Sequence, residues 1–142
     1  MTWRSARGGA YCDFDNDGDL DIALSNIDDT AQLLENIGGN ERNWIALKLI
    51  GTKSNRDAVG AQVKVQAGNL IQYDHMRAGG SYLSNNDPRL HFGLGEHSAI
   101  DAIEIRWPSG LRERLTRVTS NQIITVKEGS GVVSVLPSSK TN

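Results

Sequence analysis

Near its N-terminus the sequence carries the acidic run Asp13-Phe14-Asp15-Asn16-Asp17-Gly18-Asp19-Leu20-Asp21. A carboxylate occupies every second position of this run, and a glycine, which adopts positive φ without steric cost, occupies the sixth. Carboxylates this close together repel one another unless a hard cation neutralises them. Ca²⁺ suits the run best because it takes about six to eight oxygen ligands in flexible geometry, whereas Mg²⁺ demands a near-ideal octahedron. Zn²⁺ would require His or Cys ligands, and the run contains neither.

We therefore predict a calcium loop over residues 13–21. The side chains of Asp13, Asp15 and Asp17 each offer an oxygen from alternate positions. Asp19 offers its backbone carbonyl and Asp21 closes the site, which gives about six protein oxygens with room for a water molecule. The alternative is a solvated acidic turn, but such a turn needs neither the strict alternation nor the placed glycine.

The residues beside the loop predict strands and not the helices of an EF-hand. An EF-hand requires an acidic residue at loop position twelve, and here that position is Leu24. Apolar residues alternate with polar or small ones from Leu20 to Leu24, which is strand periodicity. The loop therefore joins two β-strands, and the pattern resembles the calcium loops of the FG-GAP or VCBS repeats found in β-propellers.

The composition excludes several classes of protein. The 142 residues make one domain, or one and a part, and 38% of them are hydrophobic. No window of about 18 apolar residues occurs, so we expect no membrane span. Of the 17 acidic residues, 5 lie in the loop, and the remaining 12 against 15 basic residues make a charge too weak to indicate nucleic-acid binding. The single cysteine, Cys12, cannot form an internal disulfide and is expected to pack as a small buried group.

The first residues, Met1 to Ser5, lack the apolar core of a signal peptide. Either the protein is intracellular, or the chain is a piece of a longer exported one. The second fits the loop better, because free calcium is scarce in the cytosol. We therefore expect an extracellular, periplasmic or cell-surface location.

Short runs rich in Val, Ile and Leu, separated by Gly or Asn-Asp clusters, predict an all-β chain. In the run from Trp44 to Ile50, the face of Ile45, Leu47 and Leu49 is the expected core face. Turns are expected at Gly68-Asn69 and at residues 107–110. Strands are expected near residues 9–12, 20–25, 32–36, 43–50, 60–67, 70–77, 90–93, 100–107, 111–117 and 122–127, with a last edge strand at 132–136.

The chain divides into three parts. Residues 1–40 hold the calcium hairpin and one further strand, and residues 41–129 hold about seven strands, which suits a β-sandwich. Residues 130–142 are expected to form a partly disordered tail. The first part holds about three of the four strands of a propeller blade. It is too small to bury a core alone, so it must pack on the sandwich, pair with another chain or belong to a propeller.

Several stretches carry family resemblances. Gly9-Ala10 leading into DFDNDGDLDIALSN, followed by LLENIGGN, resembles the last FG-GAP/VCBS repeat of a larger protein. Four later stretches resemble the ASPIC/UnbV domain: NRDAVGA at 55–61, RAGGSYLS at 77–84, RLHFGLG at 89–95 and IRWPSG at 105–110. The resemblances imply an exported, calcium-binding, adhesion- or matrix-like protein in which a propeller precedes this domain. The chain departs from that pattern because it holds only one partial repeat.

Four polar residues, Arg77, Tyr82, Arg89 and His91, lie in the densest part of the ASPIC/UnbV resemblance. They could form a polar ligand patch, but we favour a structural role, in which such side chains bind backbone carbonyls and fix loops. The three histidines of the chain lack metal-ligand spacing.

We expect a non-catalytic protein in which calcium is structural, with no catalytic and no cofactor-binding residues. No Gly-x-Ser-x-Gly elbow is present, and nothing brings Asp101, Glu104 and Glu113 together, so a hydrolase ranks third. A protein or glycan partner is expected, and open strand edges favour a homodimer. The alternative function is a carbohydrate-binding module, with the candidate aromatic residues Trp3, Trp44, Tyr73, Tyr82 and Trp107, of which Trp44 and Trp107 are expected to belong to the core or the junction.

Overall fold

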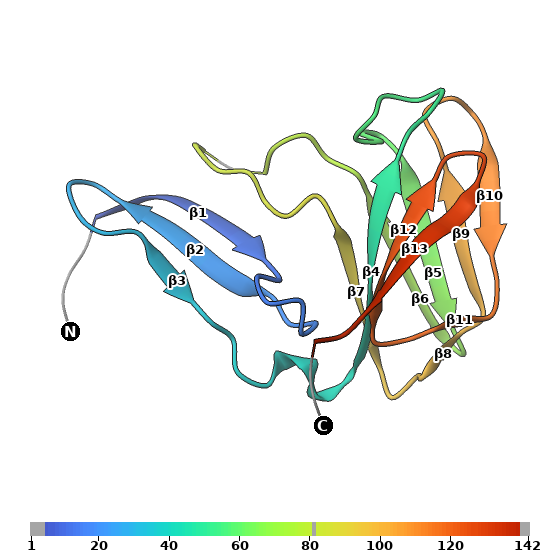
Figure 1. The fold of residues 1–142 in the computed structure, drawn as a ribbon, viewed down its shortest axis with the longest axis horizontal. Helices are drawn as coiled ribbons and strands as arrows, with labels where there is room; N and C mark the ends of the chain where they lie inside the picture. Colours follow the sequence, from blue (N-terminus) through green and yellow to red (C-terminus); the bar gives the residue numbers. More distant parts are fainter. Residues whose placement is uncertain (1–4, 81, 140–142) are drawn as a thin grey trace.

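The computed structural model describes residues 5–80 and 82–139 and consists almost entirely of β-strands (Figure 1). The predicted all-β class is therefore confirmed. None of the described residues belongs to a helix long and apolar enough to cross a membrane. The elements are β1 (Ala6–Cys12), β2 (Asp21–Asn26), β3 (Gln32–Leu34), the 3₁₀ turn η1 (Gly39–Glu41), β4 (Asn43–Ile50), β5 (Gln62–Ala67), β6 (Leu70–His75), β7 (Leu90–Gly95), β8 (Ala99–Ile100), β9 (Ala102–Arg106), β10 (Arg112–Leu115), β11 (Val118–Thr119), β12 (Gln122–Lys127) and β13 (Gly131–Pro137).

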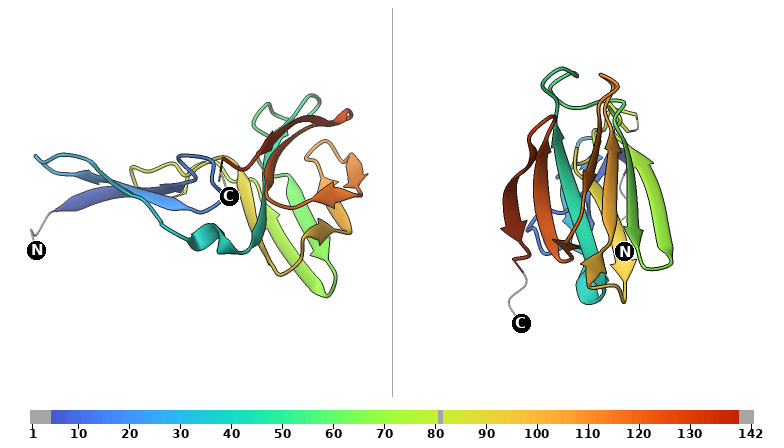
Figure 2. Two further views of the ribbon diagram at one scale, coloured as in Figure 1. Left: turned by 60° about the horizontal axis from the view of Figure 1, so that its bottom comes forward. Right: turned by 90° about the vertical axis from the view of Figure 1, so that its right-hand side faces the viewer.

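Two four-stranded sheets face each other and form a β-sandwich (Figures 1 and 2). One sheet has the order β10-β9-β5-β6, and the other has the order β13-β12-β4-β7. β12 runs parallel to β4, while the other pairings in these sheets are antiparallel. Side chains alternate across each strand, so every second residue points inward. The resulting core includes Ile45, Leu47, Val63, Val65, Leu94, Ile103, Ile105, Trp107 and Ile124.

The predicted turns are present. Ala67 pairs with Leu70 across a two-residue turn in which Gly68 has a φ of 57°. The N–H of Gly110 donates to the carbonyl of Trp107 at 2.9 Å. The single strand predicted over residues 100–107 is instead divided, because β8 pairs with β11 whereas β9 pairs with β5 and β10.

The central strand β4 is buried on both faces, which the alternation did not predict. Ile45, Leu47 and Leu49 lie in the sandwich core, as expected. On the opposite face, Trp44 and Ala46 are also buried, at 3% and 2% exposure. Their burial requires a cover on the outer side of the sheet, and the loop between β1 and β2 provides it.

A three-stranded antiparallel sheet, in the order β1-β2-β3, extends from the sandwich (Figure 1). Its outer strand β1 is joined to the segment before β7. The N–H of Tyr11 donates to Oδ1 of Asn86, and the N–H of Asp87 donates to the carbonyl of Tyr11 at 3.0 Å. The N–H of Gly9 donates to Oγ of Ser84 at 2.9 Å. The edge of β1, expected to be open, is therefore bonded at these positions within the same chain.

The C-terminal segment differs from the expected tail. The edge strand predicted at 132–136 is present as part of β13, which pairs with β12 along its length. The chain remains hydrogen-bonded beyond the strand, where Ser138 and Ser139 contact the acidic loop. Disorder was expected because these polar residues have no bonding partner close to them along the chain. Their partners are residues of the acidic loop, more than a hundred positions earlier. Residues 140–142 lie outside the described part of the chain.

Candidate metal centre

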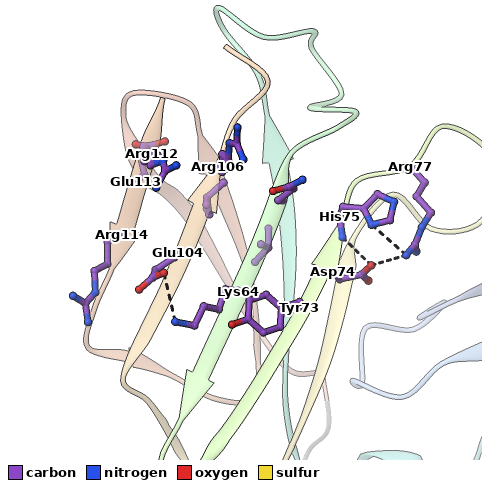
Figure 3. A pocket seen from close by; sticks show the side chains of 13 residues that line it. Lys64, Tyr73, Asp74, His75, Arg77, Glu104, Arg106, Arg112, Glu113 and Arg114 are labelled. Atoms are coloured by element: carbon purple, nitrogen blue, oxygen red, sulfur yellow. Dashed lines mark hydrogen bonds and ion pairs between the residues drawn. The ribbon is translucent and has the colours of Figure 1, made fainter. Parts of the chain in front are cut away.

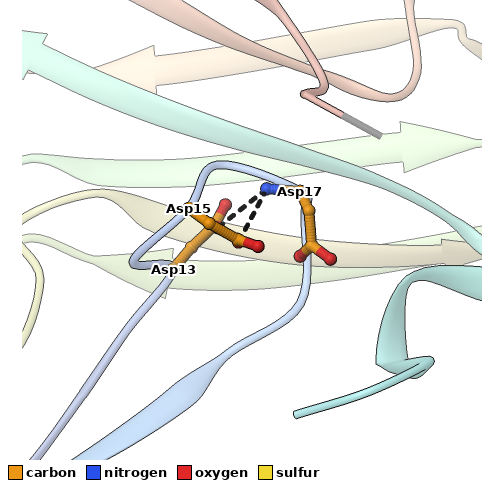
Figure 4. Close-up of side chains that lie close together, drawn as sticks. All are labelled: Asp13, Asp15 and Asp17. Atoms are coloured by element: carbon orange, nitrogen blue, oxygen red, sulfur yellow. Dashed lines mark hydrogen bonds between the residues drawn. The ribbon is translucent and has the colours of Figure 1, made fainter. Parts of the chain in front are cut away.

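Three carboxylates of the acidic run converge in the turn between β1 and β2 (Figure 4). One side-chain oxygen each from Asp13, Asp15 and Asp17 lies within 4.8 Å of the other two. The N–H of Asp17 donates to Oδ1 of Asp13 at 3.1 Å and to Oδ1 of Asp15 at 3.3 Å. Gly18 has a φ of 100°, a left-handed conformation that a glycine adopts without strain. The turn therefore brings alternate residues of the run to one point.

Asp19 and Asp21 lie outside this group of three and anchor the loop. Oδ2 of Asp19 accepts a hydrogen bond from the N–H of Gly39 at 3.1 Å. Asp21 accepts at both oxygens, from the N–H of Asn36 at 2.9 Å and from the N–H of Phe14 at 3.0 Å. A carboxylate oxygen that accepts one N–H keeps a second lone pair, so these bonds leave Asp21 able to bind a cation.

The loop buries negative charge without full compensation. Asp13 and Asp19 are each 3% exposed. Oδ2 of Asp13 and Oδ1 of Asp19 have no hydrogen-bond partner among the described residues. Burial raises the pKa of Asp13 despite the opposing charge of Arg89, and burial together with the neighbouring carboxylates raises the pKa of Asp19. A buried carboxylate oxygen without a partner is costly, and a bound cation would remove that cost.

Arg89, just before β7, connects the acidic loop to the sandwich. Its Nη1 donates to Oδ1 of Asn16 at 2.6 Å, and its Nη2 donates to the carbonyl of Asp13 at 2.7 Å. Nε donates to Oδ2 of Asp87 at 2.7 Å, and Nη2 forms an ion pair with the same carboxylate. Burial lowers the pKa of Arg89, but the hydrogen bond and charge of Asp87 outweigh it and raise the pKa overall. The guanidinium is therefore a fixed cation beneath the loop.

His91 and Trp44 form the surface on which the loop lies. The rings of these two residues stack, with centroids 5.7 Å apart and planes 12° apart. Nε2 of His91 lies 2.8 Å from the carbonyl of Gly18, and because a carbonyl only accepts, Nε2 carries the proton. A Cβ added to Gly18 would lie 1.8 Å from Cε2 of Trp44. The loop backbone thus rests directly on the indole.

The chain end beyond β13 holds the other side of the loop. Oγ of Ser138 donates to the carbonyl of Asp17 at 3.0 Å, and Oγ of Ser139 donates to the carbonyl of Asp15 at 2.8 Å. The N–H of Ser139 donates to the carbonyl of Asn16 at 2.9 Å. Sequence reasoning missed these two serines, because no local pattern relates them to the loop.

The four polar residues from the family motif have different roles. Arg89 and His91 bind loop carbonyls, which confirms the structural role favoured for them. Arg77 is largely exposed and pairs with Asp74 at 3.0 Å. Tyr82 is 69% exposed.

Cys12 is partly exposed and not fully buried as expected, because β1 is the outer strand of its sheet. Burial, and then the charge of Asp21, raise the pKa of its thiol.

Of the residues considered for other functions, Tyr73, Glu104 and Glu113 line one hollow over the sheet β10-β9-β5-β6, whereas Trp44, Trp107 and Asp101 do not. Trp44 and Trp107 are buried, as expected, whereas Tyr73 is 73% exposed; Trp3 lies outside the described residues. The three carboxylates considered for hydrolysis bind separate partners, which are Gly68 for Asp101, Lys64 for Glu104 and the Trp107 indole for Glu113.

Comparisons with known proteins relate this chain to one protein family. A family model described as ASPIC and UnbV matches residues 51–133. Cartilage acidic protein 1 of Xenopus tropicalis is 37% identical to this chain over 107 residues, and that of Homo sapiens is 36% identical over 107 residues. Each alignment covers 72% of this chain but only 16% of the relative's length. The family match begins after the acidic loop, so it does not assign the loop a role.

Proposed function

This chain belongs to the ASPIC and UnbV family, and from that premise we propose that it is a non-catalytic β-domain stabilised by calcium. The ion is held in the loop of residues 13–21. The observation that carries the proposal is the buried carboxylate of Asp13, whose Oδ2 has no partner among the described residues, beside the oxygens of Asp15 and Asp17.

The donor set suits calcium. Asp13, Asp15 and Asp17 supply one carboxylate oxygen each, the backbone carbonyl of Asp19 supplies another, and the carboxylate of Asp21 closes the set. All of these donors are hard oxygens, which Ca²⁺ prefers, and the run contains no soft or nitrogen ligand that would favour Zn²⁺. The ion would neutralise carboxylates that otherwise repel one another.

The position of the loop supports a structural role for the proposed ion. Contacts from Arg89, His91, Ser138 and Ser139 converge on the loop backbone. Since these residues belong to the sandwich and its C-terminal extension, a cation that orders the loop also fastens the three-stranded sheet to the sandwich. Both parts therefore gain stability from one site.

We further propose that residues 1–40 are the end of an FG-GAP/VCBS-type propeller and that the protein is exported. The antiparallel β1-β2-β3 sheet with an acidic turn between its first two strands supports the first point. The similarity to cartilage acidic protein 1 supports an extracellular, matrix-like or adhesion-like role. The proposed calcium site is consistent with that location, because free calcium is scarce in the cytosol.

Calorimetric titration with calcium, and melting with calcium or excess chelator, test the proposal. At free calcium about 100-fold above the dissociation constant, binding adds about 2.7 kcal/mol to the free energy of unfolding. For a chain of this size the melting midpoint should rise by about 10 °C. Magnesium at the same concentration should give a smaller shift because it requires a more rigid octahedral site.

Two double variants distinguish calcium binding in the loop from a general effect of removing negative charge. Asp15→Ala combined with Asp17→Ala should abolish the calcium-dependent shift. Glu35→Ala combined with Asp57→Ala removes the same charge from exposed positions and should preserve the shift. No calcium uptake at millimolar concentration, or an equal loss in both variants, would contradict a structural ion in this loop.

A further inference from the structure

The outer face of the sheet β10-β9-β5-β6 carries rows of polar side chains that serve neither the core nor the acidic loop (Figure 3). The register of the strands places Arg112 beside Arg106, Arg106 beside Gln62, and Gln62 beside His75. The adjacent row on the same face consists of Arg114, Glu104, Lys64 and Tyr73. Neighbouring strands lie about 4.8 Å apart, so each row presents a regular series of side chains.

The hollow over this face has an excess of positive charge, because five Lys or Arg residues line it against three carboxylates, Asp74, Glu104 and Glu113. Lys64 pairs with Glu104 at 3.7 Å. Among the described residues, no carboxylate lies within ion-pair distance of Arg106, Arg112 or Arg114. Arg106 and Arg112 stand directly opposite each other in the ladder, and like charges in that position destabilise a sheet. An anion bound between them would relieve that repulsion.

The same face also has room and an apolar platform for a ligand. A solvent-open hollow of about 720 Å³ lies over these strands. The ring of Tyr73, which is 73% exposed, stands next to Lys64 at one side of the hollow, and Arg77 and His75 lie beyond it (Figure 3). An exposed aromatic ring beside planar guanidinium groups offers both a flat stacking surface and bidentate donors for carboxylate or sulfate.

We propose that this face binds an acidic polysaccharide, a sugar chain that carries carboxylate or sulfate groups. The guanidinium groups of Arg106 and Arg112 bind the anionic substituents, and the ring of Tyr73 packs against a sugar ring. The site lies on the other sheet of the sandwich from the acidic loop, so it is independent of the calcium proposal (Figure 1).

Other anionic partners fit this surface less well. An extended acidic peptide typically adds a strand to a sheet edge, where backbone groups are unpaired. Here the ligand meets the face of the sheet, whose central strands β9 and β5 are paired on both sides, so recognition depends on side chains. Proteins that bind single-stranded nucleic acid usually stack successive bases on several aromatic rings, whereas no Phe or Trp joins Tyr73 among the described residues that line this hollow.

Titration calorimetry with defined oligosaccharides tests the proposal. The probes are a sulfated heparin-type hexasaccharide, a carboxylated galacturonate hexasaccharide and a neutral cello-hexaose of equal length. We expect at least one acidic probe to bind and the neutral probe to bind at least about tenfold more weakly. Arg106→Gln combined with Arg112→Gln should weaken acidic-probe binding at least about tenfold, since each lost charged hydrogen bond costs that order of affinity. Tyr73→Ala should weaken it severalfold.

The control removes the same charge elsewhere. Arg56→Gln combined with Lys127→Gln changes two exposed cations outside this face and should leave the affinity within about twofold. Melting midpoints no lower than that of the wild type would show that the variants fold. Binding of neither acidic probe, an equal loss in the control, or tighter binding of an acidic hexapeptide than of either acidic sugar would overturn the proposal.

Discussion

Replacing Arg89 with methionine tests whether one buried cation fastens the acidic loop to the sandwich. Methionine keeps an unbranched apolar stem like that of arginine but removes every hydrogen bond that the guanidinium donates. The Arg89 and Asp87 side chains are only 17% and 10% exposed, so the variant leaves the Asp87 carboxylate largely buried without its cation. The loop carbonyl of Asp13 loses its donor as well.

The expected loss of stability follows from these contacts. Breaking a buried ion pair by removing one partner costs about 3–5 kcal/mol, and we take about 3 kcal/mol because the pair retains some exposure. With a slope of about 1.5 kcal/mol per M of urea, the unfolding midpoint should fall by about 2 M. Intrinsic tryptophan fluorescence reports the transition, because Trp44 lies under the loop and Trp107 lies in the sandwich core.

Arg77→Met is the matched control. Arg77 also pairs with an aspartate, Asp74, but its side chain is 55% exposed. An exposed pair is worth about 0–1 kcal/mol, so the urea midpoint should move by less than about 0.7 M. Equal effects of Arg89→Met and Arg77→Met, measured with calcium and with chelator, would refute the conclusion that Arg89 connects the loop to the sandwich.

Two further predictions concern a buried carboxylate and a close backbone contact. Glu128 is 2% exposed; burial raises its pKa, but hydrogen bonds from Ser109 and from the Ser54 and Thr52 backbone prevail and lower it to about 2. Since the folded pKa lies below the ordinary value of 4.5, the ionised Glu128 stabilises the fold above pH 4.5, and this contribution is lost as the pH falls toward 2. The urea midpoint of the wild type should therefore exceed that of Glu128→Gln at pH 7, and the two midpoints should converge near pH 2. Gly18→Ala should lower the free energy of unfolding by more than the roughly 1–2 kcal/mol of a positive φ, because the added methyl group overlaps Trp44. The control is Gly129→Ala, which is also at positive φ but has open space around the new Cβ. Equal melting midpoints of the two variants would contradict the close contact between Gly18 and Trp44.

The strands were predictable wherever apolar and polar residues alternate. In β4 the alternation identified Ile45, Leu47 and Leu49 as core residues, and the turn at Gly68 followed from its residue type. The alternation could not show that Trp44 is also buried, because its cover comes from a loop far away in sequence. The alternation also could not show that residues 99–106 divide into β8 and β9. β8 pairs with β11 and β9 pairs with β5, and this change of partner depends on how distant strands are arranged and not on the local residues.

The candidate site was predicted in part. The spacing of Asp13, Asp15 and Asp17 indicated that a tight turn would bring them together, and the structure groups these three. Arg89 and His91 were expected to fix loops through backbone carbonyls, but the sequence did not show which loop they bind. Their hydrogen bonds to the loop carbonyls depend on how the three-stranded sheet packs against the sandwich, which local sequence patterns do not reveal.

The sequence by itself determined the all-β class, the location of the acidic turn and the family of the chain, because these depend on residues close together or on motifs of fixed spacing. Only the tertiary structure decided that the loop lies on Trp44, that Arg89 and the C-terminal serines hold it, and that three arginines share one open sheet face. The physical reason is that hydrogen bonds and desolvation act between atoms that are close in space, and in a β-sandwich those atoms come from strands that are distant in sequence.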